Sequence, residues 1–372
     1  MTAENIKHTR GNSPKGTAHG TTEYDPFVRG QFPVGVRTLQ GLDTVRGRRF
    51  PCEIWYPAAA KHAGQDIAPG TQDIFTVPSR DAQRSQTAVR NATAQPGIYP
   101  LIIFSHRSWG NRRQSTFLCT HLSSHGYLVA ALDHSEIVAA ELAGKEGETD
   151  EQKTARVEAW IANRAPDICF LLDHLLNDTT WDSEAKPDPT RIGIVGHSFG
   201  GWTALAAPEV EQRIAAVVAL APGGNSRPKP GIIPGKLSFN WGRDVPTLYL
   251  VAENDVPLPL AGMYELFERT PATKQMVILR RADHMHFEDN VEEMHETVRN
   301  MPFTAESAWI PKEMRPIAEL CSGAQAQLFV RGLTLCHMDA TLTGQEEAQK
   351  LLIGDIEAEL AGRGVDVIAH KP

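Results

Sequence analysis

The sequence predicts a single α/β domain whose mostly parallel sheet is flanked by helices. Short apolar runs with strand character alternate with segments of helical periodicity, and this alternation is typical of parallel strands joined by crossover helices. A hydrophobic fraction of 41% and a charged fraction of 22% are those of an ordinary globular core. The strand-like runs are 48–55, 101–105, 127–133, 191–195, 214–220, 247–252 and 275–279.

Helical periodicity is clearest between the third and fourth of these runs. Apolar residues recur there at intervals of three and four, which predicts one apolar stripe packed on the sheet; they are Ile168, Leu171, Leu172, Leu175 and Leu176. Beyond His286 the pattern becomes helical. We expect a C-terminal helix over 345–361 that ends near Gly362, because glycine is a common helix C-cap.

The domain is predicted to occupy residues 25–372, after a polar, disordered tail over 1–24. Residues 58–97 are polar with scattered Gly and Pro, and are interpreted as a surface insertion. Residues 223–244 and 287–330 follow strands that carry chemistry, where a cap or lid over a site is expected. No Pro, Gly or Ser-rich linker divides the core.

Charge and cysteine content exclude several function classes. The net charge is −8 and the sequence pI is about 6.0, which disfavours binding to nucleic acid. The five cysteines form no CxxC pair, so neither a disulfide framework nor a zinc ribbon is expected. The chain has no apolar run long enough for a membrane span and its N-terminal segment lacks a signal-peptide pattern, so we expect a cytoplasmic location.

A nucleophile motif lies at the end of the fourth strand-like run. The segment 191–201, RIGIVGHSFGG, contains G-x-S-x-G between a strand and a helix. At such a turn the hydroxyl of Ser198 is exposed at the edge of the sheet, and Gly196 and Gly200 allow strand and helix to approach closely. The motif predicts a nucleophilic serine.

A serine nucleophile needs a general base and a carboxylate that orients it. The strand at 247–252 is followed by Glu253 and Asp255, and the strand ending at 279 is followed by His284 and His286. We favour Asp255 and His284, with Glu253 and His286 as the alternates. The resulting order Ser, Asp, His is that of α/β-hydrolases. The run Asp283-His284-x-His286 also has some character of a metal site, but no metal or organic cofactor is implied.

Two backbone N–H groups are expected to stabilise the oxyanion. One is that of Phe199, which follows the nucleophile. The other is assigned to Ser108, in the loop after the strand at 101–105.

These motifs resemble those of one group of α/β-hydrolases. The segments FSHRSWG, GHSFGG, LVAEND and ADHMHF, with the N-terminal run PVGVRTLQGLDTVRGRRFPCEIWYPA, are similar to the platelet-activating-factor acetylhydrolases and the dienelactone hydrolases over about residues 30–300. Two departures matter. Arg107 replaces a glycine of the oxyanion loop, and residues 219–222, ALAP, lack the aspartate that animal acetylhydrolases carry there, so Asp255 is needed.

The resemblance and the triad together predict a serine hydrolase that cleaves a short- or medium-chain carboxylic ester. The alternatives are a lactone or thioester hydrolase of the dienelactone type, or a binding protein that has the fold without the activity. The expected partner is a small ester, and its pocket is expected to include Arg107, Trp109, Trp202, Trp241 and Met285. Arg107 is further considered as a ligand for an anionic group, together with Arg112 and Arg113.

Overall fold

The computed structural model of the protein describes residues 24–77, 82–177 and 184–370. These residues form a ten-stranded sheet and a two-stranded hairpin. In sheet order the strands are β12 (Val367–His370), β11 (Lys274–Leu279), β10 (Thr247–Ala252), β9 (Ile214–Leu220), β8 (Ala185–His197), β6 (Gly97–Ser105), β7 (Leu128–Leu132), β2 (Arg48–Pro57), β1 (Val34–Asp43) and β5 (Val89–Arg90). The hairpin pairs β3 (Asp73–Val77) with β4 (Ala82–Gln86).

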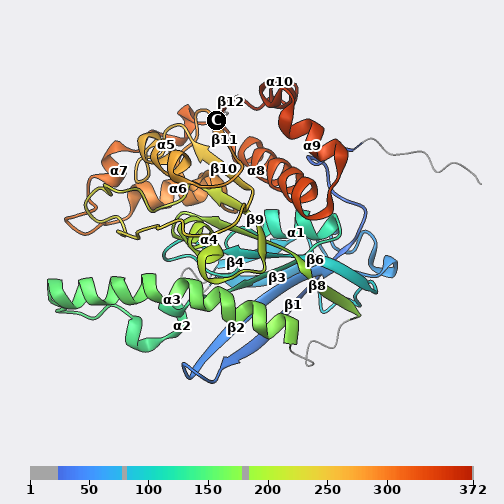
Figure 1. Ribbon diagram of the computed structural model, residues 1–372, viewed down its shortest axis with the longest axis horizontal. Coiled ribbons are helices and arrows are strands. Elements are labelled where there is room, and N and C mark those ends of the chain that lie inside the picture. The colour runs from blue at the N-terminus through green and yellow to red at the C-terminus, as the bar shows by residue number, and fades with distance from the viewer. Residues whose placement is uncertain (1–23, 78–81, 178–183, 371–372) are drawn as a thin grey trace, which may run out of the picture.

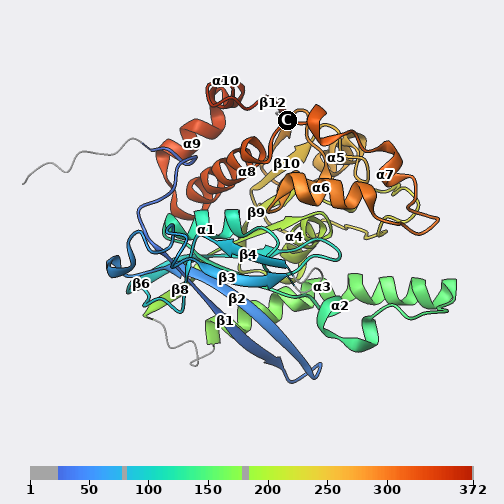
Figure 2. The same cartoon turned by 180° about the vertical axis from the view of Figure 1, so that it is seen from behind.

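Helices cover both faces of this sheet (Figures 1 and 2). The α-helices are α1 (Thr116–Ser124), α2 (Ser135–Val138), α3 (Asp150–Asn177), α4 (Phe199–Val210), α5 (Leu260–Arg269), α6 (Val291–Asn300), α7 (Ile310–Glu313), α8 (Gly323–Met338), α9 (Glu346–Ile353) and α10 (Ile356–Ala361). Shorter 3₁₀ and π turns are η1 (Ala60–His62), η2 (Ala140–Leu142), η3 (His284–Phe287), η4 (Ile317–Glu319) and η5 (Asp339–Thr343).

The central strands are buried on both faces, which explains their nearly continuous apolar sequences. Strands from β11 through β10, β9, β8 and β6 to β7 are parallel to their neighbours. Leu101 and Ile103 of β6 face a core shared with α3 and α4, whereas Ile102 and Phe104 face a second core shared with α1 and α8. The predicted α/β class with a mostly parallel sheet is confirmed.

The C-terminal region differs from its prediction. The helix expected over 345–361 is two helices, because Gly354 is extended and the side chain of Asp355 accepts a hydrogen bond from the N–H of Ala358 at 3.0 Å, which caps α10. The sequence also gave no sign of β12, which pairs antiparallel with β11. Of the predicted tail, residues 1–23 lie outside the described residues, and Tyr24 donates to Asp339 at 2.9 Å.

Residues 58–97, interpreted as a surface insertion, contribute to the sheet and to the hairpin. β5 pairs with β1 at the sheet edge. Gln86 of β4 is buried and accepts a hydrogen bond from the indole of Trp55 at 2.7 Å. This buried hydrogen bond joins the hairpin to β2 of the sheet.

The long helix α3 gives the molecule its shape on one side. Its N-terminal half projects past the sheet, at the same end of the molecule as α6 and α7 (Figures 1 and 2). The C-terminal half carries the predicted apolar stripe, with Ile168, Leu171 and Leu172 fully buried. Across the described parts of the chain, no helix combines the length and apolar character that crossing a membrane requires.

Candidate active site

Ser198 occupies a strained turn between β8 and α4. Its φ is 59° and its ψ is −115°, a conformation that non-glycine residues rarely adopt and that clusters at functional sites. Three backbone hydrogen bonds hold the turn: the N–H of Ser198 donates to the Leu220 carbonyl at 2.9 Å, and the Ser198 carbonyl accepts from the N–H groups of Trp202 at 2.9 Å and Gly223 at 3.0 Å. The backbone of the predicted nucleophile is thus fixed by its neighbours.

The two glycines of the motif are required by close backbone approach. A Cβ at Gly196 would lie 2.0 Å from the carbonyl oxygen of Gly200. A Cβ at Gly200 would lie 1.9 Å from the carbonyl oxygen of Ser105, the last residue of β6. A side chain at Gly196 would push the strand and the helix of the turn apart, and one at Gly200 would push the turn away from the end of β6.

Three strand ends bring Ser198, His284 and Asp255 together. His284 Nε2 lies 2.8 Å from Ser198 Oγ, and His284 Nδ1 lies 2.7 Å from Asp255 Oδ2. The other Asp255 oxygen accepts a hydrogen bond from the N–H of Leu258 at 2.8 Å. The carboxylate therefore orients the imidazole toward the hydroxyl, which is the arrangement in which histidine can remove the serine proton.

The electrostatics of the pair suit a general base. Burial alone would lower the pKa of His284, but the adjacent Asp255 carboxylate outweighs it and raises the pKa above its ordinary value of 6.5. Burial raises the pKa of Asp255, and the interaction with His284 opposes that rise. His197, whose ring lies 4.8 Å from that of His284, has a pKa well below its ordinary value because it is buried.

The alternates Glu253 and His286 point elsewhere. His286 Nδ1 lies 2.8 Å from Asp283 Oδ1, and its Nε2 lies 3.1 Å from the Cys321 carbonyl oxygen. Burial lowers the pKa of His286, but Asp283 more than compensates and raises it to about 10. Glu253 accepts from the N–H of Arg281 at 2.9 Å. Both residues stabilise turns beside the site, and neither contacts Ser198.

Arg107 is occupied by a carboxylate of its own chain. Its Nε lies 2.5 Å from Glu288, which is 3% exposed, and its Nη1 donates to the Ser108 carbonyl at 2.9 Å. Its neighbours in sequence, Arg112 and Arg113, both pair with the buried Glu53. These contacts argue against the predicted anion-binding role of the three arginines.

The potential metal ligands around His284 do not converge. Asp283 and His286 pair with each other, His284 contacts Asp255 and Ser198, and Glu288 pairs with Arg107. Within residues 24–77, 82–177 and 184–370, no group of three or more His, Cys, Asp or Glu side chains could hold a metal ion.

Ser198 and His284 line a pocket of about 1390 Å³. The proposed oxyanion residues Phe199 and Ser108 line it as well, and their role stays a prediction. Of the expected pocket residues, Arg107, Trp202 and Met285 line it, and Trp109 lines it with 73% of its surface exposed. Trp241 was placed in the pocket wrongly: it is 2% exposed, and its indole N–H donates to Leu205 within the core.

Beyond residues 107–114 and the segments that follow β8, β10 and β11, four further segments line the pocket. The expected cap segments contribute Ile232, Ile233, Met294, Val298, Met301, Ile310 and Met314. The sequence did not indicate the other two, namely Phe75 and Val77 of β3 and Val157 and Trp160 of α3. A usable signal was the spacing of apolar residues in this helix: Val157 and Trp160 lie three residues apart, and Trp160 lies eight residues before the buried Ile168.

Comparison with known proteins agrees with this architecture. A family model described as chlorophyllase matches residues 71–240, which include Ser198 and the loop after β6. A solved ferulic acid esterase from Streptomyces cinnamoneus superposes with a TM-score of 0.57 at 24% identity, covering 85% of this chain and 92% of that one. The chain has the α/β-hydrolase fold. Within this fold, β8 leads into the turn of Ser198, β10 is followed by Asp255, and β11 is followed by His284.

Curated relatives match over shorter stretches. The platelet-activating factor acetylhydrolase of Gallus gallus is 25% identical over 250 residues, or 54% of this chain and 56% of the relative. Cutinase est1 of Thermobifida alba is 23% identical over 234 residues, or 62% of this chain and 67% of the relative. The match thus spans little more than half the length of the chicken acetylhydrolase.

Proposed function

We propose that this α/β-hydrolase is a serine carboxylesterase that cleaves short- or medium-chain esters through an acyl-enzyme. The observation that carries the proposal is the hydrogen-bonded series Ser198, His284 and Asp255, of which Ser198 and His284 line the pocket. The likeness to an acetylhydrolase, a cutinase and a ferulic acid esterase supports the same class of reaction.

In the proposed mechanism, Ser198 Oγ attacks the ester carbonyl carbon while its proton moves to His284 Nε2. The developing oxyanion accepts hydrogen bonds from the N–H groups of Phe199 and Ser108. The tetrahedral intermediate collapses as the C–O bond breaks, and His284 gives its proton to the leaving alcohol. Water then attacks the acyl-enzyme as His284 takes its proton. The bond between the acyl carbon and Ser198 Oγ breaks, the acid leaves, and His284 returns the proton to Ser198.

The charge of the pocket favours an uncharged substrate. Each lysine and arginine among the described lining residues is paired with a carboxylate; the pairs are Arg84–Glu293, Arg107–Glu288, Arg113–Glu53, Lys153–Glu306 and Arg156–Glu148. A substrate carboxylate would therefore lose its hydration on binding and would find no unpaired cation among these residues to offset that penalty. The apolar walls match an apolar acyl or alcohol group instead.

Hydrolysis of p-nitrophenyl esters from acetate to decanoate tests the proposal directly. We expect the wild type to cleave part of the series and Ser198→Ala to cleave none above background. A wild type that is inactive on every ester would favour the binding-protein alternative. Faster turnover of lactones or thioesters than of all the linear esters would favour the dienelactone type.

A further inference from the structure

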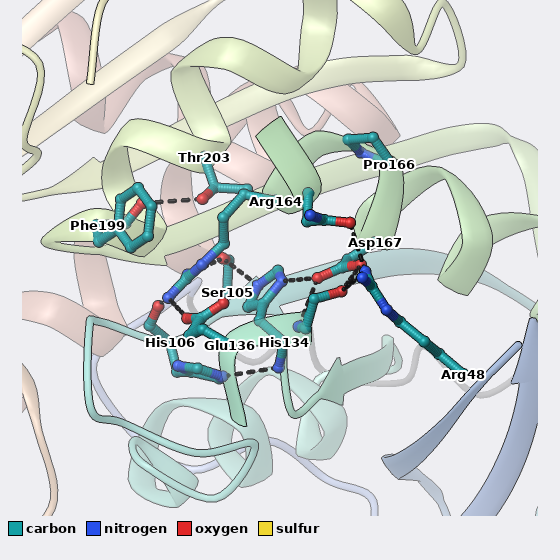
Figure 3. A network of polar contacts seen from close by, with 12 residues as sticks. Arg48, Ser105, His106, His134, Glu136, Arg164, Pro166, Asp167, Phe199 and Thr203 are labelled. Atoms are coloured by element: carbon teal, nitrogen blue, oxygen red, sulfur yellow. Dashed lines mark hydrogen bonds and ion pairs between the residues drawn. The ribbon is translucent and has the colours of Figure 1, made fainter. Parts of the chain in front are cut away.

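Arg164 of α3 is a buried arginine that contacts the loop following β6 (Figure 3). Its side chain is 0% exposed, and its counterion Glu136 is 3% exposed. Burying a guanidinium carries a large desolvation penalty, which its hydrogen bonds must offset. The acceptors of those hydrogen bonds therefore indicate which groups Arg164 positions. Arg164 is not among the residues that line the pocket, so a direct contact with substrate does not explain it.

Its donors hold two consecutive carbonyls of the loop. Arg164 Nη1 donates to the His106 carbonyl at 2.6 Å, and Nη2 donates to the Arg107 carbonyl at 3.3 Å. Nη2 also contacts Glu136. Figure 3 shows the guanidinium between the His106 backbone and Glu136.

A second donor fixes the same Arg107 carbonyl. His106 Nδ1 lies 2.7 Å from it. The other ring nitrogen, Nε2, accepts from the backbone N–H of His134 at 3.1 Å, so the ring proton belongs on Nδ1. Burial holds the pKa of His106 well below its ordinary value, which is consistent with this neutral tautomer.

Holding the Arg107 carbonyl sets the direction of the Ser108 N–H. In a trans peptide the C=O of one residue and the N–H of the next point in opposite directions. The described peptide bonds include no cis bond. With its carbonyl directed to Arg164, the peptide directs the Ser108 N–H away from α3. A rotated peptide would break both hydrogen bonds to that carbonyl.

The same guanidinium contacts the other proposed donor residue. Its carbon lies 4.1 Å from the centre of the Phe199 ring, in cation–π geometry. Phe199 is the first residue of α4, and its carbonyl accepts from Thr203 Oγ1 at 2.9 Å (Figure 3). One side chain therefore links the β6 loop to the start of α4.

We propose that Arg164 is a positioning residue for the oxyanion hole, which holds the Ser108 peptide and Phe199 in the relative orientation that the tetrahedral intermediate requires. This inference rests on the proposed esterase function. It assigns Arg164 an effect on the transition state rather than on substrate binding.

The test compares Arg164→Lys and Arg164→Gln with the matched control Arg48→Lys. Arg48 donates to Ser135 at 2.9 Å within the same buried network but does not contact the loop. For both Arg164 variants we expect kcat to fall about 10²- to 10³-fold with KM within threefold, as for loss of an oxyanion donor. The affinity for a trifluoromethyl ketone inhibitor should fall in parallel with kcat/KM. Arg48→Lys should retain the wild-type kcat.

The outcomes separate this inference from the proposed function. An inactive wild type would refute the esterase proposal itself. The positioning role would be overturned if the wild type is active and the folded Arg164 variants keep kcat within threefold. It would also be overturned if these variants raise KM and leave kcat unchanged.

If the Arg164 variants do not fold, Gln114→Leu tests the His106–Arg107 peptide, whose carbonyl Arg164 holds, from its N–H side. Gln114 Oε1 accepts from the Arg107 N–H at 2.9 Å. We expect a smaller loss, about tenfold in kcat, with KM within threefold. An unchanged kcat would overturn the proposal.

Discussion

The base of the pocket and its walls are held together by different forces. At the base, Ser198, Asp255 and His284 follow central strands and are joined by short, largely buried hydrogen bonds. Across the walls, α3 and the 287–330 segment are joined by an exposed ion pair: Lys153 Nζ lies 2.5 Å from Glu306, with the two side chains 40% and 53% exposed. Exposed pairs contribute at most about 1 kcal/mol each, whereas strand ends in a packed core cannot shift independently.

If the proposed function holds, this difference predicts that the base of the pocket determines the chemical step and that its walls determine substrate preference. Changes at the base should abolish turnover of every substrate alike. Changes in the walls should redistribute activity among substrates and leave the chemical step intact. The predictions below test that separation, beginning with the largest effect.

Loss of the nucleophile should have the greatest effect. Ser198→Ala should lower kcat about 10⁶-fold on all esters, and Asp255→Asn should lower it about 10⁴-fold because the imidazole loses its orientation. Steady-state kinetics with two esters of different chain length measure both. A fold-loss of kcat that differs between the two esters would contradict the separation of the chemical step from substrate preference.

The two histidines of the turn after β11 should behave differently. His284→Ala should match Ser198→Ala in its loss of kcat, whereas His286→Ala should keep kcat within tenfold. His286→Ala should instead destabilise the fold by about 3–5 kcal/mol, because Asp283 would be left buried and partly unpaired. Denaturant unfolding measures the second effect. Equal losses of kcat in the two variants would refute the assignment of the base.

The pH profile reports the state of His284. The base must be neutral, so kcat/KM should fall about tenfold per pH unit on the acid side. Because the His284 pKa is raised, the midpoint should lie above 6.5. Asp255→Asn should shift the residual midpoint downward, since it removes the carboxylate that raises the pKa. A wild-type midpoint below 6.5 would contradict this account.

A wall variant should change substrate preference without changing the chemistry. Ile233→Trp fills the pocket from the 223–244 segment and should lower kcat/KM for decanoate about 10- to 100-fold relative to acetate. Ile98→Trp is the control, because Ile98 is 67% exposed and does not line the pocket. An equal effect on both esters would show that the 223–244 segment influences the chemical step rather than substrate preference.

The smallest effect is expected at the exposed pair. Lys153→Ala should destabilise the fold by at most about 1 kcal/mol and leave kcat unchanged within twofold. Raising the salt concentration should remove even that difference. Thermal unfolding at two ionic strengths checks it. A larger, salt-insensitive loss would show that the pair holds the walls in place.

The same contrast explains what could be predicted from the sequence. Each member of the triad follows a strand of the parallel sheet, and parallel strands bring their carboxyl ends to one edge, so their convergence was predictable. The choice of Asp255 over Glu253 and of His284 over His286 likewise followed from position beyond the strand. In the structure, those are the residues that contact one another.

The walls and the support beneath the site were less predictable. Arg164 lies four residues before Ile168, on the buried stripe of α3, where the apolar pattern alone suggests packing. The β3–β4 hairpin contributes Phe75 to the pocket from a stretch of polar composition. Such contacts depend on which segments meet in space, and a single sequence carries no pattern for that.

The central claim is that Ser198 is the nucleophile of this pocket. Incubation of the wild type with a fluorophosphonate, followed by peptide mass spectrometry, tests it most directly. We predict one equivalent of label on Ser198, labelling that is strongly slowed in His284→Ala, and hydrolysis lost in proportion to labelling. Label on another residue, or full ester hydrolysis after Ser198 is modified, would contradict the claim.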